Sequence, residues 1–128
     1  MVNDIQLTLP EDSGYSPRTT LLRNHIIAAV TKDDDALRSD ISDTIIWHII
    51  GDRTIEGIDA FVTQSAELHN GHVKELVISD IITHGYLASV NGRVIRASES
   101  FDFCHVYWFT GVSKTAKIKE ITSYIIHQ

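Results

Sequence analysis

Three histidines lie inside otherwise apolar segments of the sequence, where an imidazole could move a proton or bind a ligand. His25 follows apolar residues at helical spacing, His48 lies among isoleucines, and His105 lies in the aromatic segment 101–110. Burial lowers the pKa of an imidazole and leaves a neutral ring that can accept or donate a proton near neutral pH. One interpretation is therefore that these rings line a pocket and act there on a ligand.

Two other interpretations of these histidines remain open. Each ring could be a core group whose nitrogens are satisfied by a neighbouring hydroxyl, carboxylate or water. Three imidazoles could also bind a metal ion, but no two of them have the short His-x-His or His-x-x-x-His spacing that is common among metal ligands. We accordingly predict no metal site and no cofactor.

The segment 101–110 has the composition and alternation of a β-strand with two different faces. Side chains alternate along a strand, so residues two apart share a face. One face carries Phe101, Phe103, His105, Tyr107 and Phe109, and the other carries Asp102, Cys104, Val106 and Trp108. A single imidazole in an aromatic row must find a polar partner or line a cavity, because burying it unpaired costs free energy.

The same kind of pattern predicts the other elements. Helical spacing predicts helices over about 17–31, 35–39 and 58–68, and β-branched or alternating residues predict strands over 40–51, 73–82, 85–90, 93–110 and 117–127. Asn91-Gly92 is typical of a two-residue hairpin turn. Residues 1–15 contain several turn-forming residues and are predicted to form an arm or edge strand. Helices followed by an antiparallel meander, with one early strand between them, indicate the α+β class.

The composition is that of one acidic domain spanning residues 1–128. With 17 acidic and 11 basic residues, the formal net charge is −6, which argues against nucleic acid and anionic membranes as partners. No apolar run approaches the roughly 20 residues of a membrane span, and the first residues lack a basic, apolar leader. Together with the single cysteine, Cys104, these features predict a cytoplasmic protein.

Four segments together resemble a known family. They are Asp40-Ile-Ser-Asp-Thr-Ile-Ile-Trp-His-Ile-Ile-Gly51, Gly57-Ile-Asp-Ala-Phe61, Phe103-Cys-His-Val-Tyr-Trp-Phe109 and Ile118-Lys-Glu-Ile-Thr-Ser-Tyr124. Over roughly residues 17–127 the chain is similar to the nuclear transport factor 2-like superfamily, in its SnoaL-like and ketosteroid isomerase-like branch. The resemblance implies a strongly curved, mostly antiparallel sheet around the N-terminal helices, forming a cone-shaped α+β barrel with a deep hydrophobic pocket.

The resemblance also assigns positions to the three histidines. Ketosteroid isomerases have their catalytic aspartate three residues before the glycine that closes the first strand, where this chain has His48 before Gly51. Their oxyanion-hole acid begins an Asp-Val-x-x-Phe run, and here His105 begins His-Val-Tyr-Trp-Phe. A tyrosine of their first helix has its nearest counterpart in His25. All three positions depart from the isomerase residues, which argues against steroid isomerisation.

The residues and the resemblance together predict a pocket for a small apolar ligand. The ligand-binding candidates are His25, Phe61, Phe103, Tyr107 and Tyr124. On this reading His25, His48 and His105 converge in the pocket, with His48 and His105 as the catalytic candidates. The pocket could support acid–base catalysis of the isomerase, cyclase, dehydratase or hydratase type, or it could bind without turnover. A third alternative is a dimeric interaction module, and the resemblance places the homodimer contact on the outer sheet face, with Trp47, Val106 and Trp108.

Overall fold

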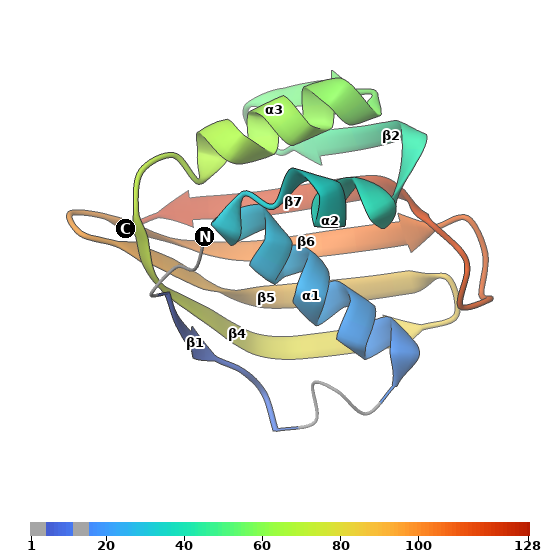
Figure 1. The fold of residues 1–128 in the computed structure, drawn as a ribbon, viewed down its shortest axis with the longest axis horizontal. Helices are drawn as coiled ribbons and strands as arrows, with labels where there is room; N and C mark the ends of the chain where they lie inside the picture. The colour runs from blue at the N-terminus through green and yellow to red at the C-terminus, as the bar shows by residue number, and fades with distance from the viewer. Residues whose placement is uncertain (1–4, 12–15) are drawn as a thin grey trace.

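The computed structural model describes residues 5–11 and 16–128, which form three helices and seven strands (Figure 1). The helices are α1 (Pro17–Thr31), α2 (Asp34–Ser39) and α3 (Ile58–Leu68). The strands are β1 (Gln6–Thr8), β2 (Ile41–Ile49), β3 (Arg53–Glu56), β4 (Val73–His84), β5 (Leu87–Arg96), β6 (Ser100–Phe109) and β7 (Ile118–His127). Of the predicted arm, residues 1–4 and 12–15 lie outside the described residues, while β1 is the predicted edge strand.

One sheet contains all seven described strands, in the order β1-β4-β5-β6-β7-β2-β3. β1 runs parallel to β4 and β2 runs parallel to β7, while the other neighbouring strands are antiparallel. The sheet curls, and the helices lie on its inner face (Figure 1). The predicted α+β class and the curved, mostly antiparallel sheet are therefore confirmed. Within the described residues β1 and β3 remain edges, so the sheet does not close into a full barrel.

The first helix begins where the sequence predicts it and carries His25 into the interior. Ser16 caps the first turn by accepting a backbone hydrogen bond, and Pro17 follows at the first helical position. Leu22, His25 and Ile26 form the buried face of α1. Because the two aliphatic neighbours pack against the core, the imidazole between them is held inside as well.

The predicted hairpin turn at Asn91-Gly92 is wrong. Both residues lie inside β5, which pairs with β6 along its length. The chain reverses before β5 at Gly85 (φ 61°), where the predicted strands 73–82 and 85–90 also leave a break, and after β5 at residues 97–99. Gly92 is required because a Cβ atom there would collide with the backbone carbonyl of Val77, next to an irregularity in the pairing of β4 with β5. A close approach of two backbones thus produces the same sequence signature as a turn.

Two strand boundaries also differ from the prediction. The predicted strand 93–110 is in fact two pieces, the end of β5 and all of β6, which are separated by a turn at residues 97–99. The Arg96 N–H donates to the Glu99 carbonyl across this turn at 2.8 Å. The short strand β3, which pairs with β2 after the turn at Gly51, has no counterpart in the prediction. Four residues are too few to show a reliable alternation.

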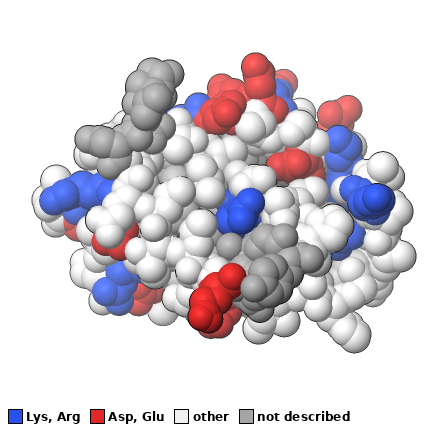
Figure 2. Space-filling view, turned by 60° about the horizontal axis from the view of Figure 1, so that its bottom comes forward, with Lys and Arg blue, Asp and Glu red and all other residues white. Residues whose placement is uncertain are grey.

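The space between the helices and the sheet holds the apolar core, whose largest fully buried side chains include Tyr107, Phe101 and Phe109. On the face drawn in Figure 2, charged side chains of both signs are scattered in small groups among uncharged ones. None of the helices that the structure describes is long and apolar enough to cross a membrane.

Candidate functional site

The inner face of β6 forms one wall of a cavity beneath α1 and α3. Phe103, His105 and Tyr107 lie on this wall, and His25 of α1 and Phe61 of α3 line the cavity as well. The volume open to the centre of a water molecule is about 30 Å³. That is room for about two waters, so the interior is nearly filled by side chains, in contrast to the deep pocket expected from the resemblance.

A chain of two hydrogen bonds, the first buried and the second partly buried, holds His105 in the wall. The indole Nε1–H of Trp47 in β2 donates to Ser123 Oγ in β7 at 2.8 Å, and the same hydroxyl lies 2.6 Å from His105 Nδ1. Phe103 stacks on the imidazole with 4.7 Å between ring centroids. The hydroxyl and the aromatic face together fix the orientation of the His105 ring.

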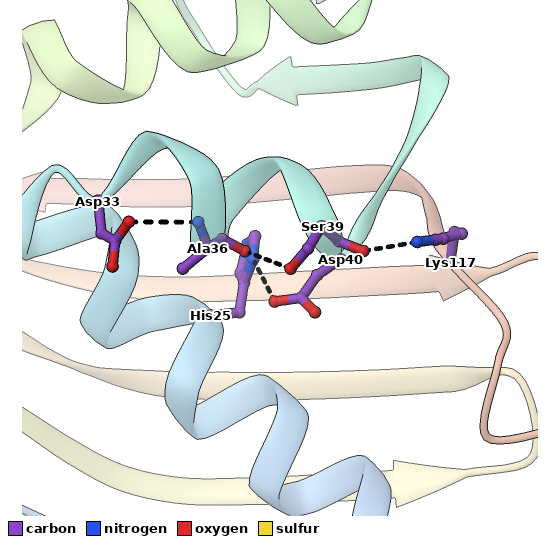
Figure 3. A network of polar contacts seen from close by, with 6 residues as sticks. All are labelled: His25, Asp33, Ala36, Ser39, Asp40 and Lys117. Atoms are coloured by element: carbon purple, nitrogen blue, oxygen red, sulfur yellow. Dashed lines mark hydrogen bonds and ion pairs between the residues drawn. The ribbon is translucent and has the colours of Figure 1, made fainter.

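The ring of His25 packs among aromatic groups on the opposite side of the cavity. Its centroid lies 6.3 Å from that of Phe61, which is stacked with it, and 5.8 Å from that of Tyr107, which meets it edge-on. The Nδ1 atom is sealed from solvent and has no hydrogen-bond partner among the described residues. Asp40 Oδ2 lies 3.9 Å from Nδ1, which is within ion-pair range but beyond hydrogen-bond length (Figure 3).

A third imidazole, that of His69, also lines the cavity. The sequence suggests a surface residue here because His69 lies near the end of a helix, and that expectation is wrong: His69 is 6% exposed and packs 6.1 Å from Phe101. Its Nδ1 atom is sealed and has no hydrogen-bond partner within the described ranges. A usable signal exists in the spacing, since Phe61, Ser65 and His69 follow one another at four-residue intervals along one helix face.

The three cavity imidazoles are neutral at physiological pH. Burial lowers the pKa of His25 to about 4. Burial also lowers the pKa of His69 to about 4, with smaller contributions from the positive charges of Arg96 and Lys32. The pKa of His105 falls to about 3, mainly through burial and further through the other two histidines. The wall can therefore donate or accept hydrogen bonds without carrying charge.

The structure does not bring His48 to this cavity. β2 turns Trp47 inward, where it is 4% exposed, so the adjacent His48 lies on the outer face. There its Nε2 pairs with Glu120 at 2.7 Å and its Nδ1 faces Thr54 at 3.3 Å. The predictions that His48 shares a pocket with His105 and that Trp47 lies on the outer face are both wrong. Both faces of the strand are apolar in the sequence, so alternation cannot choose between them.

Tyr124 also lies outside the cavity, because β7 turns the neighbouring Ser123 inward. Tyr124 is 48% exposed and lines a groove on the outer face with Cys104, so its placement as a pocket residue is wrong. Val106 and Trp108 alternate onto the same outer face, as predicted, and are half-buried. The described residues contain no group of three His, Cys, Asp or Glu side chains arranged to hold a metal ion.

Comparisons with known proteins identify similar structures but no similar sequence. The sequence matches no protein-family model and no curated protein. An NTF-2 like protein of unknown function from Burkholderia xenovorans LB400 is 17% identical, with a TM-score of 0.73 over 90% of this chain and 86% of that one. A ketosteroid isomerase-like protein from Kribbella flavida is 12% identical, with a TM-score of 0.70 over 83% and 75% of the two chains. An LEH-like epoxide hydrolase from M. tuberculosis is 19% identical, with a TM-score of 0.64 over 83% of this chain and 80% of that one.

Proposed function

We propose that this chain, which has the nuclear transport factor 2-like fold, binds a small, uncharged and mostly apolar molecule in the cavity between its helices and its sheet. The observation that carries the proposal is the set of unpaired imidazole nitrogens at that cavity. Nδ1 of His69 is sealed and lacks a partner among the described residues, and Nδ1 of His25 faces Asp40 at 3.9 Å, which leaves the other nitrogen of that ring for the cavity. A buried polar atom without a partner costs about 1–3 kcal/mol, which a ligand with a matching polar group recovers.

The walls also specify the kind of ligand. Aromatic rings, including Phe61, Phe103 and Tyr107, supply flat apolar surface. The neutral imidazoles offer hydrogen bonds but no counter-charge, so an ion entering the cavity would lose its hydration without compensation. A flat, neutral ring with a polar edge fits both conditions.

The size of the cavity limits how tightly such a ligand binds. A cavity volume of about 30 Å³ is well below the roughly 150 Å³ of an engineered cavity that binds benzene, so side chains at the wall must move for a ring to enter. Core side chains resist such shifts because interiors are closely packed. We expect a dissociation constant on the order of 1 mM for a ring of five heavy atoms, which corresponds to about 4 kcal/mol of binding free energy.

Pyrazole is a suitable test ligand because its neutral ring carries an N–H donor beside a nitrogen acceptor. We expect it to shift the NMR signals of cavity residues in a saturable manner, whereas thiophene, which has a similar shape and no strong polar group, binds at least about fivefold more weakly. The variant His105→Phe should lose pyrazole binding, and His84→Ala, at an exposed position, should keep it. Equal binding of thiophene, or pyrazole shifts confined to the outer sheet face, would contradict the proposal.

Acid–base turnover is a second candidate, favoured by the fixed orientation of His105. With a pKa of about 3 this ring is a weak base, but its N–H can stabilise developing oxyanion charge. The fold also occurs in a protein that is named an epoxide hydrolase. The test is deuterium exchange from D₂O into the carbons beside the carbonyl of cyclopentanone, followed by NMR. Exchange that is no faster with the wild type than with His105→Phe would exclude this role.

Self-association through the outer sheet face is an alternative to a pocket function. Half-buried Trp108 and Val106 share this face with Tyr124 and Ile126, which are 48% and 64% exposed. Apolar and aromatic groups of this kind commonly anchor interfaces. Light scattering coupled to size exclusion should then give a dimer for the wild type and a monomer for Trp108→Ala combined with Ile126→Glu. A monomeric wild type at high concentration would refute the dimer.

A further inference from the structure

We infer that His25 and His105 are held in opposite tautomers, so that the cavity presents one hydrogen-bond acceptor and one donor to a ligand that itself carries a donor beside an acceptor. The inference rests on the proposed binding function and specifies the class of ligand. Cyclic amides, azoles and enols belong to this class. Their N-alkyl or O-alkyl derivatives, which have lost the donor, do not.

The tautomer of His105 follows from its neighbours. The Trp47 indole can only donate a hydrogen bond, and it occupies one acceptor position of Ser123 Oγ. The hydroxyl proton of the fully buried Ser123 then needs an acceptor of its own, and among the described residues His105 Nδ1 is the one within reach, at 2.6 Å. Nδ1 therefore accepts, and the proton of the neutral His105 ring lies on Nε2, which remains available as a donor.

The tautomer of His25 follows from a carboxylate. Figure 3 shows the His25 ring reaching from α1 toward Asp40, which lies at the junction of α2 and β2. Nδ1 lies 3.9 Å from Asp40 Oδ2 and has no closer polar partner in the described part of the chain. A carboxylate at this distance attracts an N–H and repels a nitrogen lone pair. The proton of His25 therefore lies on Nδ1, and Nε2 remains as the acceptor for the cavity.

The charge on Asp40 depends on its surroundings. Burial raises the pKa of this carboxyl to about 6, and the positive charge of Lys117 opposes the rise. Lys117 is held nearby by its hydrogen bond to the Ser39 carbonyl at 2.6 Å (Figure 3). Asp40 is thus ionised at pH 7.5 while His25 is neutral. Asp40 is a positioning residue that acts through His25.

The tautomers can be read directly from the ¹⁵N shifts of the imidazoles by two-bond NMR correlation at pH 7.5. We expect the Nδ1–H form for His25 and the Nε2–H form for His105. Asp40→Ala should convert His25 to a mixture of tautomers, Asp40→Asn should retain part of the preference because its amide oxygen can still accept, and the exposed Asp43→Asn should change nothing. The Nε2–H form of His25 in the wild type, or an unchanged His25 tautomer in Asp40→Ala, would overturn the inference.

Ligand selectivity provides a second readout. Pyrazole should bind at least about fivefold more tightly than 1-methylpyrazole, which lacks the donor, and Asp40→Ala should reduce this difference while Asp43→Asn preserves it. Equal binding of the two ligands to the wild type would overturn the donor–acceptor assignment. If neither ligand binds while the tautomers are as expected, the binding function fails and the tautomer assignment stands, so the two failures are distinguishable.

Discussion

Acidification should destabilise this protein steeply between pH 7.5 and pH 5, because three cavity imidazoles must remain neutral for the chain to stay folded; His25 and His69 are buried and His105 is partly buried. The pKa of His25 and that of His69 are lowered to about 4 by burial, and that of His105 is lowered to about 3. In the unfolded chain each ring titrates near pH 6.5. The unfolded chain therefore binds more protons below this pH, and stability that is fully present above pH 6.5 is lost as the pH falls toward 4.

The magnitude follows from these pKa values. At pH 5 each ring is almost fully charged in the unfolded chain and neutral in the folded one, which costs about 2 kcal/mol per ring relative to pH 7.5, or about 6 kcal/mol for the three. Asp40 acts in the opposite direction: its pKa is raised to about 6, so the folded chain takes up a proton there as the pH falls. This proton uptake adds about 1 kcal/mol to the free energy of unfolding at pH 5, so the net loss of stability relative to pH 7.5 is about 5 kcal/mol. A loss of this size is comparable to the total stability of many domains.

Urea denaturation at half-unit pH steps measures this loss. We expect the unfolding midpoint to fall continuously from pH 7.5 to pH 5, and His69→Leu to remove about one third of the pH dependence. His84→Ala, at an exposed position, serves as the matched control and should leave the dependence unchanged. A free energy of unfolding that is constant within about 1 kcal/mol over this range would refute the assignment of three buried neutral rings.

Two further substitutions test individual features. Gly92→Ala should destabilise the protein by about 1–3 kcal/mol, because its Cβ would meet the Val77 carbonyl, whereas Gly111→Ala, with open space around its Cβ position, should be nearly neutral in urea denaturation. His48→Ala should lower the free energy of unfolding by no more than about 1 kcal/mol, because the His48–Glu120 pair is partly exposed. The same variant should keep pyrazole affinity within about twofold of the wild type in an NMR titration.

The elements with a strong period are those that the sequence predicts best. The helix α3 and the strand β6 repeat their apolar residues often enough to fix both type and inward face, and His105 follows from that strand. The helix α1 is marked instead by its start, where Ser16 caps the first turn and Pro17 follows. Gly92 misleads because glycine is required both by turns and by close backbone contacts, and only the pairing of β4 with β5 distinguishes the two.

The candidate site is only partly predictable, for a similar reason. In β2, Trp47 and His48 lie on opposite faces, so only one of them can point inward. The sequence does not show which, because both faces of the strand are otherwise apolar. Trp47 is the one inside, where it donates a hydrogen bond to Ser123, a residue 76 positions away that local patterns cannot reveal. His69 becomes part of the site because the chain after α3 continues the buried face of that helix.

A crystal structure of the protein soaked in pyrazole tests the binding site most directly. We expect the ring to lie between α1 and β6, with one nitrogen within hydrogen-bond distance of His25 Nε2 and the other within hydrogen-bond distance of His105 Nε2. Pyrazole density found only on the outer face of the sheet, for example beside His48, or an interior that stays closed at saturating pyrazole, would contradict the proposed site.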